Sequence, residues 1–202
     1  TLTRKNGLLY GLLLAPDAVY EILPVAGGQQ LRQLDQARFP ECGGAVDAPD
    51  HAHTAPAATS HSATPQRAST ANTLIDVLVL YTPQARDAAG SVALIEATAQ
   101  AAVDNANTAF SNSNVPAQFN LVHIALADHD DAGNIGTDLT WVANDSTVAS
   151  LRSSVGADLV GLLVEDGAGS CGIGYVMRNV GPSFASSGFQ VTARTCAVGN
   201  LS

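Results

Sequence analysis

One stretch decides the fold: Gly167-Ala-Gly-Ser-Cys-Gly-Ile-Gly-Tyr-Val-Met177, followed by Phe189-Gln-Val-Thr-Ala-Arg-Thr-Cys-Ala-Val-Gly-Asn-Leu-Ser202. It contains two β-prone runs, Ile173–Met177 and Phe189–Thr195, joined by a loop rich in Gly, Pro and Ser. The final Asn200-Leu201 is typical of a helix start, with a polar cap before an apolar residue. We expect the helix itself to lie beyond Ser202.

The residues before this stretch predict alternating strands and helices. Leu74–Leu80 is apolar almost throughout, which indicates a central strand covered on both faces. Thr82 and Pro83 are typical of a helix start, and we expect one long helix from there to about Phe110. Its predicted buried stripe consists of Ala88, Val92, Ile95, Ala99, Ala102, Ala106 and Phe110.

Further strands and helices follow in the same order. The ranges Phe119–Ala127 and Ala157–Val164 predict strands, and Asp138–Val155 predicts two helical pieces, the second starting at Asp145. Strands that alternate with helices favour right-handed crossovers and a mostly parallel sheet. The expected fold class is therefore α/β, with residues 73–202 as the main domain.

The N-terminal part predicts a separate small β module. Strand patterns at Leu8–Leu14, Val19–Val25 and Gln30–Leu34 lie within residues 1–44. Residues 45–72 are rich in Ala, Pro, Ser, Thr and His and contain little that could form a core. We expect this segment to be a disordered linker that a protease could cut.

Composition excludes some function classes. Asp+Glu 18 against Lys+Arg 9 gives a net charge of −9, which argues against binding to nucleic acid or to anionic membranes. The longest apolar run, Gly7–Ala15, is too short to cross a bilayer.

Since the first residue is Thr1, we expect that an N-terminal signal peptide has been lost. The three cysteines fit one disulfide and one odd thiol.

Two glycine-rich motifs near Cys171 are weak. Gly167–Gly172 reads G-x-G-x-x-G, but a β-prone run follows instead of the helix that a dinucleotide site requires. Ser170 similarly lacks the following helix of a nucleophile elbow, and no later histidine is present to act as its base. Neither nucleotide binding nor serine hydrolysis is favoured.

The histidines and one acidic loop have ordinary interpretations that we favour. His51, His53 and His61 lie in the linker, where a solvated chain is favoured over a metal site. His123 is expected in a strand and His129 in the loop Asp128–Gly133. That loop has acids at the first and third positions of a calcium loop but lacks its later ligands, which favours an acidic surface loop.

Four segments together resemble a known family. They are Ile75-Asp-Val-Leu-Val-Leu-Tyr-Thr-Pro83, Leu151-Arg152 with Gly156-Ala-Asp-Leu-Val160, Cys171-Gly-Ile-Gly-Tyr-Val176, and Cys196-Ala-Val-Gly-Asn-Leu-Ser202. In this order and spacing they resemble the reprolysin-like (adamalysin-like) zinc metalloendopeptidases of the metzincin group, and look most similar to the bacterial peptidyl-Asp metalloendopeptidases. The resemblance implies a zincin-type subdomain with a mostly parallel sheet, an antiparallel edge strand and long helices.

The resemblance also implies where zinc and substrate bind. The family's zinc motif, H-E-x-x-H-x-x-G-x-x-H, would follow Ser202, so no zinc ligand or catalytic residue is assigned to this chain. The edge strand that pairs antiparallel with substrate corresponds to Gly172, Ile173, Gly174, Tyr175 and Val176. Cys171 and Cys196 would form a disulfide that ties this strand to the approach of the zinc helix.

The N-terminal module resembles the end of the family's propeptide. Tyr20-Glu-Ile-Leu-Pro24, Leu31 to Asp35 and Pro40-Glu-Cys-Gly43 carry this similarity. A propeptide cysteine can occupy the fourth zinc position as a thiolate, and Cys42 is the candidate for this cysteine switch. The alternative is a surface cysteine in a short module.

Two functions remain in competition. The first is a secreted zymogen of a zinc metalloendopeptidase that acts on protein or peptide substrates, with this chain as an inactive, monomeric fragment. The second is a non-catalytic secreted module that binds peptides on a zincin-like scaffold. The residues encoded after Ser202 distinguish them, because only the enzyme would carry the zinc motif.

Overall fold

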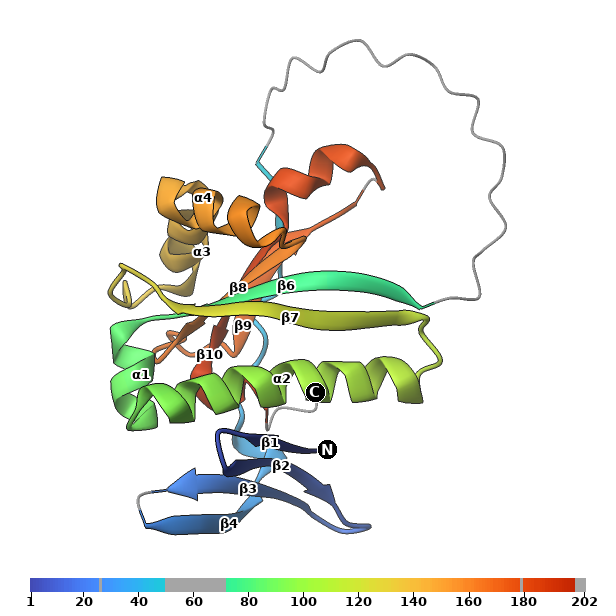
Figure 1. The fold of residues 1–202 in the computed structure, drawn as a ribbon, viewed down its shortest axis with the longest axis vertical. Coiled ribbons are helices and arrows are strands. Elements are labelled where there is room, and N and C mark those ends of the chain that lie inside the picture. Colours follow the sequence, from blue (N-terminus) through green and yellow to red (C-terminus); the bar gives the residue numbers. More distant parts are fainter. Residues whose placement is uncertain (26, 50–71, 179, 199–202) are drawn as a thin grey trace.

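The computed structural model describes residues 1–25, 27–49, 72–178 and 180–198. Within these residues the chain forms two β-sheets with one long helix between them (Figure 1). The first sheet is antiparallel, in the order β1-β2-β3-β4. Its strands are β1 (Leu2–Lys5), β2 (Leu8–Leu14), β3 (Val19–Val25) and β4 (Gly28–Leu34).

The second sheet has the order β5-β9-β10-β8-β6-β7. Its strands are β5 (Ala45–Asp47), β6 (Thr73–Tyr81), β7 (Ala117–Leu126), β8 (Leu159–Val164), β9 (Gly172–Val176) and β10 (Phe189–Ala193). Strands β10, β8, β6 and β7 are mutually parallel, and β9 runs antiparallel to β10. The predicted α/β class with a mostly parallel sheet is confirmed.

The central strand β6 is covered on both faces, as its apolar sequence predicts. Leu78 and Leu80 pack against the layer that contains α3 (Ile135–Asn144) and α4 (Ser146–Val155). Val77 and Val79 point to the opposite face, where they pack in the cluster with Ile95 and Ala99 of α2 (Val92–Asn112). The described residues also form three short 3-10 segments: η1 (Gln36–Arg38), η2 (Pro182–Ser187) and η3 (Arg194–Cys196).

The single long helix predicted after Thr82 is wrong: the structure has α1 (Pro83–Ala89) and a separate helix α2. Gly90 ends α1 in the left-handed conformation, with φ 97°, which costs glycine little. The Ser91 side chain then accepts a hydrogen bond from the backbone N–H of Leu94 and caps α2. As a result Val92, predicted to be buried, is 48% exposed.

Helix α2 is buried on a second side that the sequence did not predict. Ala101 packs with Tyr10 and Leu12 of the N-terminal sheet. The Thr3 hydroxyl donates a hydrogen bond to the Asp104 carboxylate on the same helix. The N-terminal module is therefore docked on α2, and small alanines on this helix let both sheets approach it.

The boundary predicted for the linker is also wrong. Ala45–Asp47 was expected to be disordered, but it forms β5 and pairs in parallel with β9. The backbone groups of β9 offer hydrogen bonds to this segment, and these bonds stabilise its strand conformation although its intrinsic preference for β structure is weak. The linker residues 50–71, with His51, His53 and His61, lie outside the described residues.

In the described part of the chain, no helix has the length and apolar character needed to span a bilayer.

Candidate functional site

Strand β9 is the centre of the candidate site, and both of its sides are occupied. On one side it pairs with β10, with Ile173 opposite Val191. On the other side lie residues 41–47, which include β5. The predicted edge strand is therefore present as a strand, but β5 forms the outer edge of the sheet in this structure.

The segment 41–47 follows β9 along its length. The Cys171 N–H donates to the Glu41 carbonyl at 2.9 Å, and the Gly43 N–H donates to the Gly172 carbonyl at 2.8 Å. The parallel ladder then continues to the pair Asp47 and Val176. Residues predicted to end the N-terminal module and to begin the linker thus lie together along β9, and the last three of them form β5.

Glycine is required where this segment approaches β9 most closely. A Cβ atom on Gly43 would lie 2.1 Å from the Ile173 Cγ2 atom and 3.2 Å from the Gly172 carbonyl oxygen. Gly172 is similarly tight, because a Cβ there would lie 2.9 Å from the Val191 carbonyl oxygen. Residues 41–47, β9 and β10 can approach one another this closely because these two positions carry no side chain.

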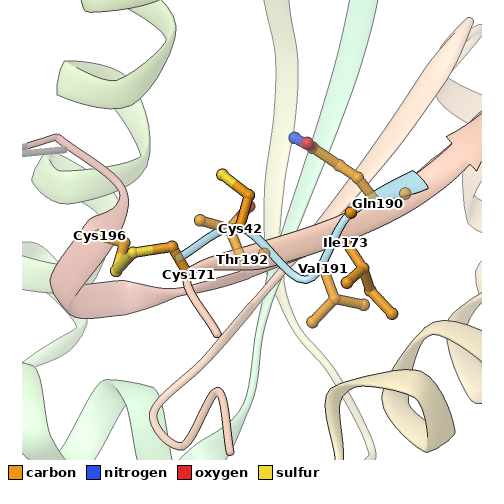
Figure 2. Close-up of a pocket in the computed structure, with 10 residues that line it drawn as sticks. Cys42, Cys171, Ile173, Gln190, Val191, Thr192 and Cys196 are labelled. Carbon is orange, nitrogen blue, oxygen red and sulfur yellow. A yellow bond between two sulfur atoms is a disulfide. The ribbon is translucent and has the colours of Figure 1, made fainter. Parts of the chain in front are cut away.

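Cys42 lies beside β9 as an exposed free thiol. It lines a hollow of about 330 Å³ with Gly172, Gly174, Gln190 and Thr192 among its other lining residues. Figure 2 shows the Cys42 and Gln190 side chains on one side of the sheet, and those of Ile173 and Val191 on the other. The thiol is therefore presented on one defined face, that of Gln190.

That face continues into an apolar groove between the sheet and α2. A cavity of about 270 Å³ has Val77, Ala102, Gly161, Gln190 and Thr192 among its lining residues. Gln190 and Thr192 also line the hollow of Cys42, so the thiol is next to this groove. The groove is walled mostly by small and apolar side chains, which suits the packing of a further apolar segment.

A disulfide joins the two cysteines that the resemblance pairs. Cys171 and Cys196 are bonded, with their Cα atoms 5.4 Å apart. Both are buried and pack with Ala193 and Phe39. The bond fixes the start of β9 to η3, which follows β10.

The end of β9 carries an ion pair that the sequence analysis missed. The Arg178 Nε atom donates a hydrogen bond to the Asp47 Oδ1 atom. The two residues are 131 positions apart, so no local pattern could reveal the pair.

Burial raises the pKa of the hydroxyl group of Tyr175, which lies on β9.

The histidines in the described part of the chain lie apart from β9. His123 is exposed on β7. The His129 Nε2 atom lies 2.7 Å from the Asp138 Oδ1 atom, and its ring stacks on Trp141 at 4.0 Å. Among the described residues, no group of three or more His, Cys, Asp or Glu side chains is placed to hold a metal ion.

The acidic loop after β7 has a structural role. The Asp131 Oδ2 atom accepts hydrogen bonds from the backbone N–H groups of Glu165 and Asp166, at 2.7 and 3.1 Å. Glu165 in turn accepts two bonds from Arg194, at 2.6 and 2.9 Å. These contacts connect the loop to the end of β8 and to the residue that follows β10.

Comparison with known proteins identifies relatives. The chain is 29% identical over a 214-position alignment to a peptidyl-Asp metalloendopeptidase of Xanthomonas campestris, which covers 100% of this chain and 48% of the relative. It is 36% identical over 108 residues to a peptidyl-Asp metalloendopeptidase of Pseudomonas aeruginosa, covering 50% of this chain and 18% of the relative. The chain thus spans about half the length, or less, of these curated relatives.

Structure comparison agrees on the fold. The crystal structure of metalloproteinase-II from Bacteroides fragilis superposes with a TM-score of 0.50 at 9% identity, covering 98% of this chain and 64% of that one. The family model of the reprolysin-like metallo-peptidase family M12B matches residues 96–201, which is more than half of the chain. This chain belongs to the reprolysin-like metallo-peptidases of family M12B.

Proposed function

We propose that this chain is part of the latent form of a secreted zinc metalloendopeptidase. It would comprise the end of the propeptide, residues 1–47, and the first part of the catalytic domain. The observation that carries the proposal is the extended segment 41–47, which includes β5 and lies along β9. The family resemblance assigns β9 to substrate binding, so the segment would occupy the place of a substrate.

The direction of this segment fits a latent state. Strand β5 runs parallel to β9, whereas the resemblance implies that a substrate strand runs antiparallel to it. A parallel strand presents its peptide groups in the reverse order. Residues 41–47 would therefore block the strand without offering a peptide bond in the orientation of a substrate.

The zinc ligands are expected outside this chain. The described residues do not fit a zinc site, because they lack a group of three possible ligands. Cys42 can supply one thiolate, and it lies next to the groove between the sheet and α2. We propose that a helix with the family's H-E-x-x-H motif follows Ser202 and packs in this groove. Zinc bound there would lower the pKa of a water molecule and generate the nucleophile for peptide hydrolysis.

In the latent protein, Cys42 would act as the cysteine switch. Its side chain lies on the same face as Gln190, toward the groove (Figure 2). The backbone contacts of Glu41 and Gly43 with β9 hold the cysteine in place from both sides. The substrates would be proteins or peptides, and the names of the relatives favour substrates that contain Asp.

The test uses the full-length protein, including the residues encoded after Ser202. We expect one equivalent of zinc and hydrolysis of a protein substrate that a chelator abolishes. Cys42→Ala and Cys42→Ser should both activate faster than the wild type, since serine keeps the size of the side chain but is a poor zinc ligand. A full-length protein that binds peptides but neither holds zinc nor hydrolyses them would show that the chain belongs to a binding module.

A further inference from the structure

We propose that Arg178 forms a subsite for an acidic side chain in the peptide strand that lies on β9. Asp47 fills this subsite in the present structure, and a substrate carboxylate would fill it once residues 45–47 leave. The inference rests on the proposed function, because it requires that substrate replaces β5.

The geometry places Arg178 at a fixed position of the strand. Asp47 is paired with Val176, the last residue of β9, and Arg178 follows two residues later. The Arg178 Nε atom donates a hydrogen bond to the Asp47 Oδ1 atom. The guanidinium therefore reaches the side chain of the residue opposite Val176.

The position does not depend on the direction of the bound strand. In parallel and antiparallel ladders alike, residues directly opposite each other project their side chains to the same face of the sheet. An antiparallel substrate residue opposite Val176 would therefore project to the same face as Asp47 does. Arg178 has a long, flexible side chain and can adjust to the small difference in spacing between the two ladders.

Arg178 differs from the other arginines in the described part of the main domain. Arg86 pairs with its neighbour Asp87, and Arg194 pairs with Glu165. Arg152 donates to the backbone carbonyls of Ala157, Asp158 and Ala185. These partners remain when residues 45–47 leave, whereas the ionic partner of Arg178 leaves with them. Departure of β5 thus opens a cationic site at the end of β9.

The expected selectivity is modest. The side chains of Arg178 and Asp47 are 64% and 73% exposed, so solvent screens the pair. Exposed ion pairs of this kind correspond to a preference of about two- to fivefold for a carboxylate over a neutral side chain. The preference should fall at high salt, because mobile ions screen exposed charges.

The first experiment measures hydrolysis by the activated full-length protein. Matched peptides carry Asp or Asn at one position at a time, and kcat/KM is determined for each. The wild type should prefer Asp by about two- to fivefold at one position, and Arg178→Gln should remove that preference while leaving the others unchanged. At the same position, Arg178→Glu should favour a peptide with Lys over the peptide with Asp. The matched control is Arg86→Gln, since Arg86 pairs with its neighbour Asp87 on α1 and lies in the domain that remains after activation. If Arg178→Gln keeps the Asp preference at every position, the proposal is overturned.

A second experiment does not depend on activity. Hydrogen exchange of the β5 amides reports how often this strand leaves β9. Asp47→Asn and Arg178→Gln should each raise the exchange rate by about two- to fivefold, and the double variant should show no further increase. Increases that multiply in the double variant would overturn the proposal. A protein that shows this coupling but hydrolyses no peptide would contradict the proposed function and leave the carboxylate site standing.

Discussion

Replacing Gly43 with alanine should weaken the docking of residues 41–47 on β9. The new methyl group would lie 2.1 Å from the Ile173 Cγ2 atom, far inside van der Waals contact. Ile173 is β-branched and packs against the main core, so its side chain has little freedom to move away. The overlap is therefore expected to be relieved by separation of residues 41–47 from β9.

The size of the effect follows from the cost of overpacking. Adding a methyl group to a tightly packed site costs about 1–3 kcal/mol. If this cost falls on the docked strand, its opening equilibrium increases by about 5- to 150-fold. The amides of Ala45–Asp47 should then exchange faster with solvent by the same factor, and amides in β6 should be unaffected.

Two further variants make the measurement specific. Gly28→Ala is the matched control, since Gly28 lies in β4 and a Cβ atom there meets nothing within 4 Å. Ile173→Ala removes the atom that the new methyl group meets, so it should restore most of the protection in the Gly43→Ala background. Unchanged exchange at β5 in Gly43→Ala, or an absence of rescue, would refute the proposed packing of this segment on β9.

Three other changes have definite expected outcomes. Replacing Cys171 and Cys196 together by serine should lower the free energy of unfolding in urea by about 3 kcal/mol, because their bond closes a loop of 25 residues; an unchanged value would contradict this. Burial, and then the Glu21 carboxylate, raise the pKa of Tyr10 above its ordinary 10.0, so the unfolded state ionises first and stability should fall as pH rises above 10. Tyr10→Phe should show a shallower fall between pH 9 and pH 11 in chemical denaturation, and an equal slope would exclude this tyrosine as the cause. Asp145→Ala removes the side chain that accepts hydrogen bonds from two amides of α4, and should cost about 1 kcal/mol of stability in the same assay.

The main sheet and its later helices could be predicted because their signals are local. An apolar run as strong as Leu74–Leu80 has few interpretations other than a strand buried on both faces. Asp145 and Gly156 mark the two ends of α4 with a capping side chain and a left-handed glycine. Each of these signals depends on neighbouring residues alone, so tertiary contacts did not override them.

The errors arose where one pattern concealed another. The apolar residues at three- and four-residue spacing continue across Gly90-Ser91, from Ala88 to Val92, and this concealed the break between α1 and α2. Ala97 and Ala101 lie outside the predicted stripe, yet each is at most 1% exposed. The N-terminal sheet buries Ala101, and the docking of one module on another leaves no periodic signal in the sequence.

The candidate site could be predicted only in part, for a similar reason. The glycines of β9 and the two bonded cysteines were identified by resemblance to a family, since their spacing alone fits several kinds of loop. Asp47 and Arg178 come together only because β5 is paired with β9. A strand of three residues at the start of an Ala- and Pro-rich segment has almost no β propensity of its own.

That weakness of β5 has a consequence for how the site would open. All three residues of β5 are exposed, and within the described residues the strand pairs with the sheet through β9 alone. It therefore buries little apolar surface, and its stability depends on backbone hydrogen bonds, Gly43 and the exposed pair with Arg178. By contrast, β10 on the other side of β9 carries the buried Val191 and pairs with β8 as well. Local opening favours the segments with the fewest buried contacts. The strand that the proposed function requires to leave is thus expected to separate first, while β9 stays fixed by β10 and by the Cys171–Cys196 bond.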